Sequence, residues 1–230
     1  MQRIINITVS TASLSSAAYL PPTTRVVREG TALSLREFAS SDAEALAEIL
    51  GDPHVMRHTS SGAMSYEDVV DLVREAEADQ ADPARTRHRL AIVQREGGAL
   101  VGTVTVERER YSSVYSHSII LRPHLANLSA GYEASQLVAG LAFDELGVHR
   151  LWFMTAVDNL AAQRLFLASG STQDGKVREL YFRDGRWWDC YMFTILEHEW
   201  RARAHLTLRE AIALLRQQEQ QPLALEPVTA

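Results

Sequence analysis

Cysteine is almost absent from this sequence, whose 230 residues include a single one, Cys190. One thiol cannot close an internal disulfide or build a cysteine-ligated zinc site, and no metal site is predicted. Cys190 lies within an apolar strand pattern, which indicates a buried structural thiol rather than a nucleophile.

A long apolar run and an excess of basic residues are also lacking. No run approaches the roughly 18 apolar residues of a membrane span, and Asn6, Thr8 and Ser10 interrupt any leader-like apolar stretch. The net charge of -6 argues against a nucleic-acid backbone as the main partner and favours a cationic acceptor. We therefore expect a cytoplasmic protein that binds neither membrane nor nucleic acid.

What is present is the composition of a globular domain, with 46% hydrophobic and 23% charged residues. The Ser/Thr-rich residues 1–30, with a short strand pattern at residues 4–9, predict an N-terminal arm that lies on the domain or on a second subunit of a homodimer. The domain itself is expected over residues 31–200. A C-terminal helix and tail follow over residues 201–230.

Several segments carry helix signals. Ser41-Asp42-Ala43-Glu44 reads as a capping box for a first helix, and a second helix is capped at Ser65. Residues 54–63, between these two helices, form a polar segment with His58 that either lines a site or is a solvated connection. Further on, a long helix is expected to end at Gly147, and Asn159 is expected to cap another that stops at Gly170. A capping box at residues 207–210 opens the C-terminal helix.

Strand patterns alternate with these helices. They cover residues 33–38, 90–93, 100–110, 115–121 and 151–156, followed by a hairpin of residues 177–182 and 187–196 around an Asp-Gly turn. The order β-α-α-β-β-β-α-β-α-β-β predicts an α/β (α+β) fold. Its central sheet is mixed and largely antiparallel, with helices on both faces.

The centre of the chain is a strand, a loop over residues 122–130, and a helix. Amides at the start of a helix, together with the positive end of its dipole, make a ready anion site. The alternative is an ordinary β-loop-α connection.

The element order and several local motifs resemble the GNAT superfamily of acyl-CoA-dependent N-acyltransferases. The resemblance is closest to the branch that acetylates ribosomal-protein N-termini and related amines. The motifs run from Leu33 to Trp200 and include Ile119-Ile120-Leu121-Arg122-Pro123, Glu133-Ala134, residues 142–151, Asp158-Asn159 with Arg164 and Gly170, Arg178-Glu179, residues 185–189, and Leu196-Glu197-His198-Glu199-Trp200.

The resemblance implies that acetyl-CoA, or another acyl-CoA, binds where two central strands splay apart. The pantetheine arm would pair like an added strand with the backbone of Ile119, Ile120 and Leu121. Asn159 matches a family position that contacts the cofactor arm, and Phe166 stands where many members carry a tyrosine. The pyrophosphate would lie on the loop amides of Asn127, Leu128, Ser129, Ala130, Gly131 and Tyr132.

This loop departs from the family pattern Gln/Arg-x-x-Gly-x-Gly/Ala and is degenerate. Aligned through Glu133-Ala134, the pattern falls on Ala126, Ser129 and Gly131, so only its last position is kept. A glycine in place of Ser129 would let the backbone approach a phosphate closely and adopt a positive φ. Serine is small, and its hydroxyl adds a donor.

The acid–base groups of the family do not carry over by identity. Phe166 replaces the tyrosine that protonates the leaving thiolate, and Ala162 replaces the serine of the ribosomal branch. The glutamates on the strand before the loop and on the late hairpin correspond to Ser116 and Tyr181.

Transfer to an amine still needs a base, because a protonated amine has no lone pair. Glu107 and His117, on neighbouring predicted strands, are the candidates, and an imidazole has a suitable pKa of about 6.5. Tyr181 is the candidate acid. For each of the three, the alternative is an ordinary strand residue that is exposed, hydrogen-bonded or packed.

Three functions are therefore open. The first is an N-acyltransferase that moves an acetyl or other acyl group from a CoA thioester to a small-molecule or peptide amine by direct attack. The second is a GNAT-shaped domain that has lost CoA chemistry and binds a ligand or partner, which the altered loop favours. The third takes its acyl group from a carrier-protein thioester, whose pantetheine arm needs no pyrophosphate site.

Overall fold

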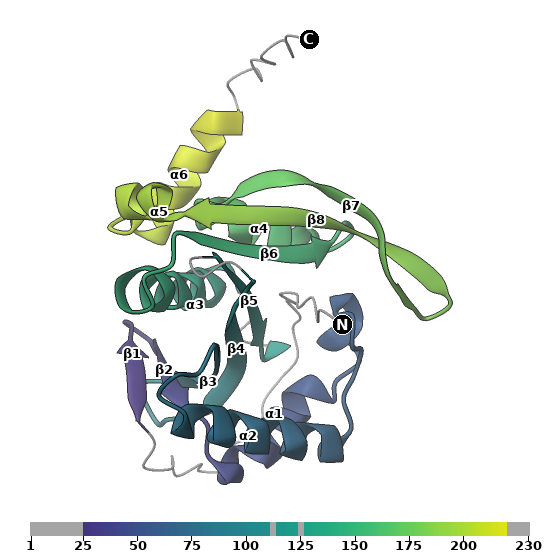
Figure 1. Ribbon diagram of the computed structural model, residues 1–230. Coiled ribbons are helices and arrows are strands. Elements are labelled where there is room, and N and C mark those ends of the chain that lie inside the picture. Colours follow the sequence, from purple (N-terminus) through teal and green to yellow (C-terminus); the bar gives the residue numbers. More distant parts are fainter. Residues whose placement is uncertain (1–24, 111–113, 124–126, 220–230) are drawn as a thin grey trace.

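A computed structural model describes residues 25–110, 114–123 and 127–219 (Figure 1). Its eight strands form one sheet in the order β1-β2-β3-β4-β5-β6-β8-β7, in which β5 and β6 are parallel and the other neighbours antiparallel. The predicted mixed, largely antiparallel sheet is confirmed. The strands are β1 (Val26–Glu29), β2 (Leu33–Glu37), β3 (Arg87–Gln94), β4 (Leu100–Arg108), β5 (Val114–Leu121), β6 (Arg150–Ala156), β7 (Thr172–Arg183) and β8 (Arg186–Leu196).

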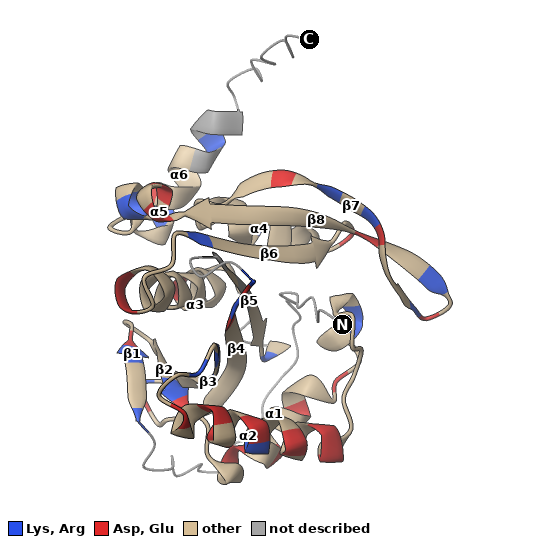
Figure 2. Ribbon diagram, in the orientation of Figure 1, with Lys and Arg blue, Asp and Glu red and all other residues tan. Residues whose placement is uncertain are grey.

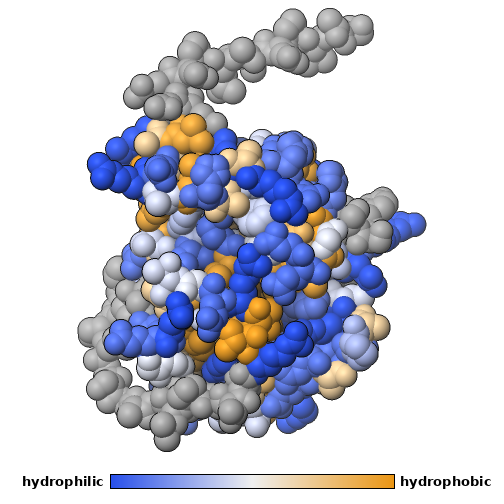
Figure 3. Space-filling model, turned by 90° about the vertical axis from the view of Figure 1, so that its left-hand side faces the viewer, coloured by the Kyte–Doolittle hydropathy of each residue, from blue (hydrophilic) through white to orange (hydrophobic). Residues whose placement is uncertain are grey.

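Helices cover both faces of the sheet, as predicted. On one face, α1 and α2 pack in a buried cluster with Ala91, Leu100 and Ile120 of the strands. On the other face, α3 and α4 share a larger cluster with residues such as Val104 and Phe193. The helices are α1 (Ala43–Leu50), α2 (Tyr66–Ala81), α3 (Leu128–Gly140), α4 (Leu160–Ala168), α5 (Glu197–Arg203) and α6 (Leu208–Glu219). Seen from the side of α3 and β1, the surface is mostly hydrophilic, with apolar side chains in separate patches (Figure 3).

The structure adds elements at both ends of the expected domain. The strand β1, within the stretch expected as an arm, joins the sheet by pairing with β2. The short helix α5 was not predicted, and it follows β8 directly. The strand pattern at residues 4–9 lies outside the described residues.

The start of α1 differs from the predicted capping box. The chain enters it through a 3₁₀ turn, Ser40–Asp42, and the carboxylate of Asp42 accepts a hydrogen bond of 2.9 Å from the amide of Ala39. The same carboxylate receives two hydrogen bonds from the guanidinium of Arg36, at 2.7 and 2.8 Å. Asp42 is therefore a buried ion-pair partner rather than the second residue of a cap box.

Other local signals are confirmed. Ser65 and Asp68 form a reciprocal cap at the start of α2, and Thr207 and Glu210 do the same at α6. The hairpin of β7 and β8 turns at Asp184-Gly185, where both residues have positive φ, 52° and 75°. These signals act within a few residues, which is why sequence patterns capture them.

Cys190 is fully buried in β8, as expected of a structural thiol. Burial raises the pKa of this thiol to about 12, so it stays protonated at neutral pH. Among the described helices, none combines the length and apolar character needed to cross a membrane.

His88, in β3, makes the stability of the fold depend on pH. Burial, followed by the charge of Arg85, lowers the pKa of His88 to about 4 from its ordinary 6.5. The unfolded chain therefore binds a proton at this group below pH 6.5, whereas the folded chain does so only near pH 4. Above pH 6.5 His88 is neutral in both states and does not reduce the free energy of unfolding. As the pH falls from 6.5 toward 4, protonation of the unfolded chain lowers this free energy.

Between pH 7 and pH 5, we expect His88 to remove about 2 kcal/mol from the free energy of unfolding. Urea titrations of the wild type and of His88→Gln at both pH values check this. The variant should lose about 2 kcal/mol less than the wild type, and an equal loss in the two proteins would contradict the expectation.

Candidate active site

The strands β5 and β6 pair at one end only. Residues 114–116 of β5 pair with residues 150–152 of β6, and beyond them no further pairing joins the two strands in the described part of the chain. Yet β5 stays paired with β4 up to Leu121, and β6 stays paired with β8 up to Ala156. The two strands therefore part, as expected, and backbone groups of Ile119, Ile120 and Leu121 lie on the parted stretch of β5.

The helix α3 begins close to the end of β5. The loop predicted over residues 122–130 is shorter, because Asn127 caps α3 and its side chain accepts a hydrogen bond of 2.9 Å from the amide of Ala130. The amide of Gly131 donates to the carbonyl of Asn127 at 3.0 Å. Helix geometry leaves the amides of Leu128 and Ser129 without an acceptor inside the helix, so these two are available to an anion. Ala126 lies outside the described residues.

The side-chain positions of Gly131 and Tyr132 pack within the protein. A Cβ atom added to Gly131 would lie 2.8 Å from a methyl carbon of Leu165, so this glycine lets α3 approach α4 closely. The hydroxyl of Tyr132 donates to the carbonyl of Leu206 at 3.0 Å, and burial raises its pKa. Both side-chain positions thus face the protein.

Asn159, which was expected near the cofactor arm, is buried where β6 leads into α4. Its side chain caps α4 through the amide of Ala162 at 3.3 Å and donates to the hydroxyl of Thr155 at 3.0 Å. Phe166, on α4, is also 2% exposed, and its ring centroid lies 4.2 Å from that of Phe153.

The two candidate bases occupy different faces of the sheet. Glu107 is exposed and opposite Ser116, whereas His117 is opposite the buried Val106. Opposed residues share a face and successive residues alternate, so positions 107 and 117 lie on opposite faces. The side chain of His117 lies outside the described part of the structure, and both bases stay predictions.

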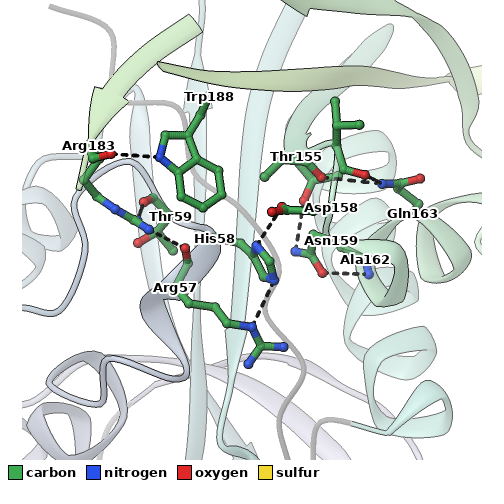
Figure 4. Close-up of polar contacts among 12 residues, drawn as sticks. Arg57, His58, Thr59, Thr155, Asp158, Asn159, Ala162, Gln163, Arg183 and Trp188 are labelled. Atoms are coloured by element: carbon green, nitrogen blue, oxygen red, sulfur yellow. Dashed lines mark hydrogen bonds and ion pairs between the residues drawn. The ribbon is translucent and has the colours of Figure 1, made fainter. Parts of the chain in front are cut away.

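A polar cluster that was not predicted gathers around His58 on the α1 and α2 side (Figure 4). This buried residue ends a 3₁₀ turn, Met56–His58. Its Nδ1 lies 3.2 Å from Oδ1 of Asp158, and its Nε2 accepts a hydrogen bond of 3.0 Å from Nε of Arg57. Because a guanidinium can only donate, Nε2 carries no proton and the ring proton is on Nδ1, toward Asp158.

The pair of His58 and Asp158 connects the two sides of the parting strands. Met56, two residues before His58, packs in the same buried cluster as Ile120 of β5. Asp158 follows the end of β6 and precedes Asn159. The contact therefore lies beyond the point where β5 and β6 cease to pair.

The segment of residues 56–59 is held by Arg183, near the turn of the β7–β8 hairpin. The guanidinium of Arg183 donates to the main-chain carbonyls of Met56, Arg57 and Thr59. Three carbonyls converging on one cation fix the course of this segment, and with it the position of the His58 ring.

Tyr181 and Trp188, from β7 and β8, form the wall beside His58. Their rings stack, with centroids 5.9 Å apart, and the hydroxyl of Tyr181 donates to the carbonyl of His58 at 3.4 Å. The guanidinium carbon of Arg186 lies 3.5 Å from the centre of the Trp188 ring, and this guanidinium also contacts Asp158. Figure 2 shows basic and acidic residues interspersed along this hairpin, whereas acidic residues predominate on helices α1 and α2.

Burial sets the protonation of these groups. It lowers the pKa of His58 below 6.5; the charge of Asp158 opposes this shift, and those of Arg57 and Arg183 add to it. Burial also raises the pKa of Tyr181 above its ordinary value. At neutral pH the cluster thus holds a neutral imidazole and a neutral phenol, which can take up and supply protons. Within the described residues, no three metal-binding side chains come together.

Sequence reasoning missed the partnership of His58 with Asp158. The sequence places His58 only in a polar segment, and Asp158 only in the Asp158-Asn159 motif at the start of a helix. The available signal was a histidine in a polar connection between two capped helices, but nothing in that segment points to a partner a hundred positions later.

Comparison with known proteins agrees with the fold. The family model described as "Acetyltransferase (GNAT) domain" matches residues 32–172, more than half of the chain. The uncharacterized N-acetyltransferase YnaD of Bacillus subtilis (strain 168) is 25% identical over 168 residues, which are 73% of this chain and 95% of that protein.

Two solved structures share the fold. A GNAT-family acetyltransferase from Bacillus anthracis superposes with a TM-score of 0.65 at 22% identity, covering 76% of this chain and 98% of that one. The spermidine N-acetyltransferase of Vibrio cholerae, solved in complex with CoA and spermine, gives a TM-score of 0.65 at 19% identity, covering 74% and 98%. Together with the family match, these findings establish that the chain belongs to the acetyltransferase (GNAT) domain family and is an acyltransferase.

Proposed function

We propose that this protein transfers an acetyl or other acyl group from a CoA thioester to an amine by direct attack. The observation that carries the proposal is the parting of β5 and β6 after three residue pairs, next to the amides that open α3. A strand edge without a partner can pair with an extended pantetheine arm, and a helix start attracts phosphate.

The residues present fit such a cofactor. The backbone of Ile119, Ile120 and Leu121 would hold the pantetheine amides, and the amides of Leu128 and Ser129 would receive the pyrophosphate. Asn159 is already fixed by its bonds to Thr155 and to α4, so it offers a rigid contact beside the arm. When bound, the cofactor supplies an activated acyl group whose carbonyl carbon is open to a nucleophile.

The acceptor is proposed to be a small-molecule or peptide amine that approaches from the α1 and α2 side. There the neutral imidazole of His58 and the phenol of Tyr181 lie near the wall formed by Trp188. The net charge of -6 favours an acceptor that is cationic before it reacts. The similarity to a spermidine N-acetyltransferase supports an amine of this kind.

The proposal is tested by mixing purified protein with acetyl-CoA and one of three amines, namely spermidine, benzylamine or the peptide amide Ser-Ala-Ala-Ala. Release of free thiol, followed with a thiol reagent, is expected with at least one of them. Titration calorimetry should show binding of acetyl-CoA at micromolar concentrations. Absence of binding heat up to millimolar acetyl-CoA, or no thiol release with any of the three amines, would overturn the proposal.

Ser129→Glu is expected to weaken acetyl-CoA binding by about 10–100-fold. The added carboxylate stands at the helix start that would receive the pyrophosphate, and two negative charges a few ångströms apart repel each other by a few kcal/mol before salt screening. Calorimetry measures the change in dissociation constant. The matched control, Ser129→Ala, removes the hydroxyl without adding charge and should change binding less than threefold. If the Glu variant bound acetyl-CoA as tightly as the wild type, the pyrophosphate would not bind at this helix start.

A further inference from the structure

The imidazole of His58 is buried, has a fixed tautomer and faces the side from which the acceptor would approach. We propose that His58 takes up the proton that the acceptor amine loses, and that Asp158 is the residue that positions the imidazole for this task. This inference rests on the proposed acyl transfer and names the proton acceptor for it.

The position of His58 supports this role. Asp158, its partner, is the neighbour of Asn159, which is the residue expected beside the cofactor arm. On the other side, Met56 of the turn that carries His58 belongs to the same buried cluster as Ile120, on the parted stretch of β5. A thioester held between the parted strands would therefore lie near the His58–Asp158 pair, at the end of the strands where β5 and β6 are no longer paired.

The two nitrogens of the His58 ring have different partners and would have different roles. Asp158 lies against Nδ1 and can stabilise the imidazolium that forms, as a carboxylate does when it orients a histidine. Arg57 occupies the lone pair of Nε2 through a single N–H group. An acceptor in its ammonium form is, like Arg57, a cationic N–H donor. It can therefore replace Arg57 as the donor to Nε2, and this hydrogen bond would orient the acceptor.

The transfer then balances as follows. The ammonium gives one proton to Nε2 of His58, and the freed lone pair forms a C–N bond to the carbonyl carbon of the thioester. The C–S bond breaks and its electron pair goes to the sulfur. The nitrogen, cationic again after the attack, loses a second proton, which ends on the sulfur as a free thiol. After the products leave, Nε2 of the imidazolium returns this proton to solvent, which restores the starting tautomer with its proton on Nδ1.

The charged and titratable groups around His58 set its response to pH. They are Asp158 after β6, Arg57 and His54 on its own segment, Tyr181 and Arg183 on β7, and Arg186 on β8. Because burial lowers the pKa of His58, the acid limb of kcat/KM should lie below pH 6.5. Asp158 raises this pKa and Arg57 lowers it, so removing each charge shifts the limb in opposite directions.

The experiment measures kcat/KM against pH with the one of the three amines that releases thiol fastest. His58→Gln is expected to lower kcat by about 10²–10⁴-fold and to abolish the acid limb. Asp158→Asn should move the limb to lower pH, and Arg57→Gln should move it to higher pH. A residue with a merely structural role would not produce these opposite shifts. Asp158 is half-exposed, so its isosteric variant tests the proposal even if His58→Gln folds poorly.

The control is His205→Gln, an exposed histidine between α5 and α6. It should keep kcat within about twofold, and acetyl-CoA binding should be unchanged in every variant. If His58→Gln retains wild-type kcat and the same acid limb while the wild type acylates the amine, this inference fails and the proposed function stands. If the wild type binds acetyl-CoA but releases no thiol with any amine, the proposed function fails and takes the inference with it.

Discussion

Replacement of Asp42 by alanine is expected to lower the free energy of unfolding by about 3–5 kcal/mol. The side chains of Asp42 and Arg36 are 0% and 4% exposed, and two short hydrogen bonds join them. The variant leaves the guanidinium of Arg36 buried without its counterion, and that cost exceeds the value of the pair itself. It also removes the cap on the amide of Ala39. Urea denaturation at pH 7 measures the change.

Two further variants serve as controls for Asp42→Ala. Asp71→Ala removes an ion pair with Arg74 whose side chains are 63% and 70% exposed, and it should cost no more than about 0.5 kcal/mol. The double variant Arg36→Met with Asp42→Leu replaces both charges by apolar groups and should recover most of the lost stability. Equal losses for Asp42→Ala and Asp71→Ala would show that the buried pair does not support the fold.

Phe193→Ala is expected to cost about 3–5 kcal/mol, by a different mechanism. Phe193 is fully buried at the centre of an aromatic group with Phe153 and Phe166, with ring centroids 6.0 and 5.1 Å from its own. Its removal leaves a cavity between β8, β6 and α4 that rigid neighbours on three elements cannot fill. Thermal unfolding and urea unfolding should both show this loss in the free energy of unfolding.

The matched control is Phe182→Ala, on the neighbouring strand of the same hairpin. Phe182 is 59% exposed and contacts Trp187 at 5.4 Å between ring centroids. Its removal should change the free energy of unfolding by about 0.5–1.5 kcal/mol, the value of one exposed aromatic pair. If the loss for Phe193→Ala is as small, the aromatic group is not the core that its burial indicates.

Patterns confined to a few residues predicted much of the fold. Ser65 with Asp68 and Thr207 with Glu210 form their caps from side chains three positions apart, and Asp184-Gly185 turns the hairpin by its own backbone preference. The family resemblance added the parting of the central strands, which β5 and β6 show. Each of these features needs only a local signal or a known topology.

Features that depend on distant partners were missed. Asp42 lies within the predicted capping box, but its carboxylate is buried and accepts hydrogen bonds from the guanidinium of Arg36. The loop before α3 was expected to continue to residue 130, but the side chain of Asn127 caps the helix three residues earlier. His58 is an unremarkable loop residue until the fold brings Asp158 to its ring. Local propensity cannot report contacts that only tertiary structure creates.

Arg183 has a consequence for the order in which the protein assembles. The carbonyl of Met56 meets its guanidinium partner 127 positions later in the chain. A polypeptide emerging from the ribosome therefore exposes the segment around His58 long before the residue that anchors it has been synthesised. Both helices that flank this segment can fold early, but the segment around His58 takes its final form only after the last hairpin closes. Nascent chains stalled before that hairpin should therefore be cleaved by proteases at this segment, whereas the full-length protein should resist.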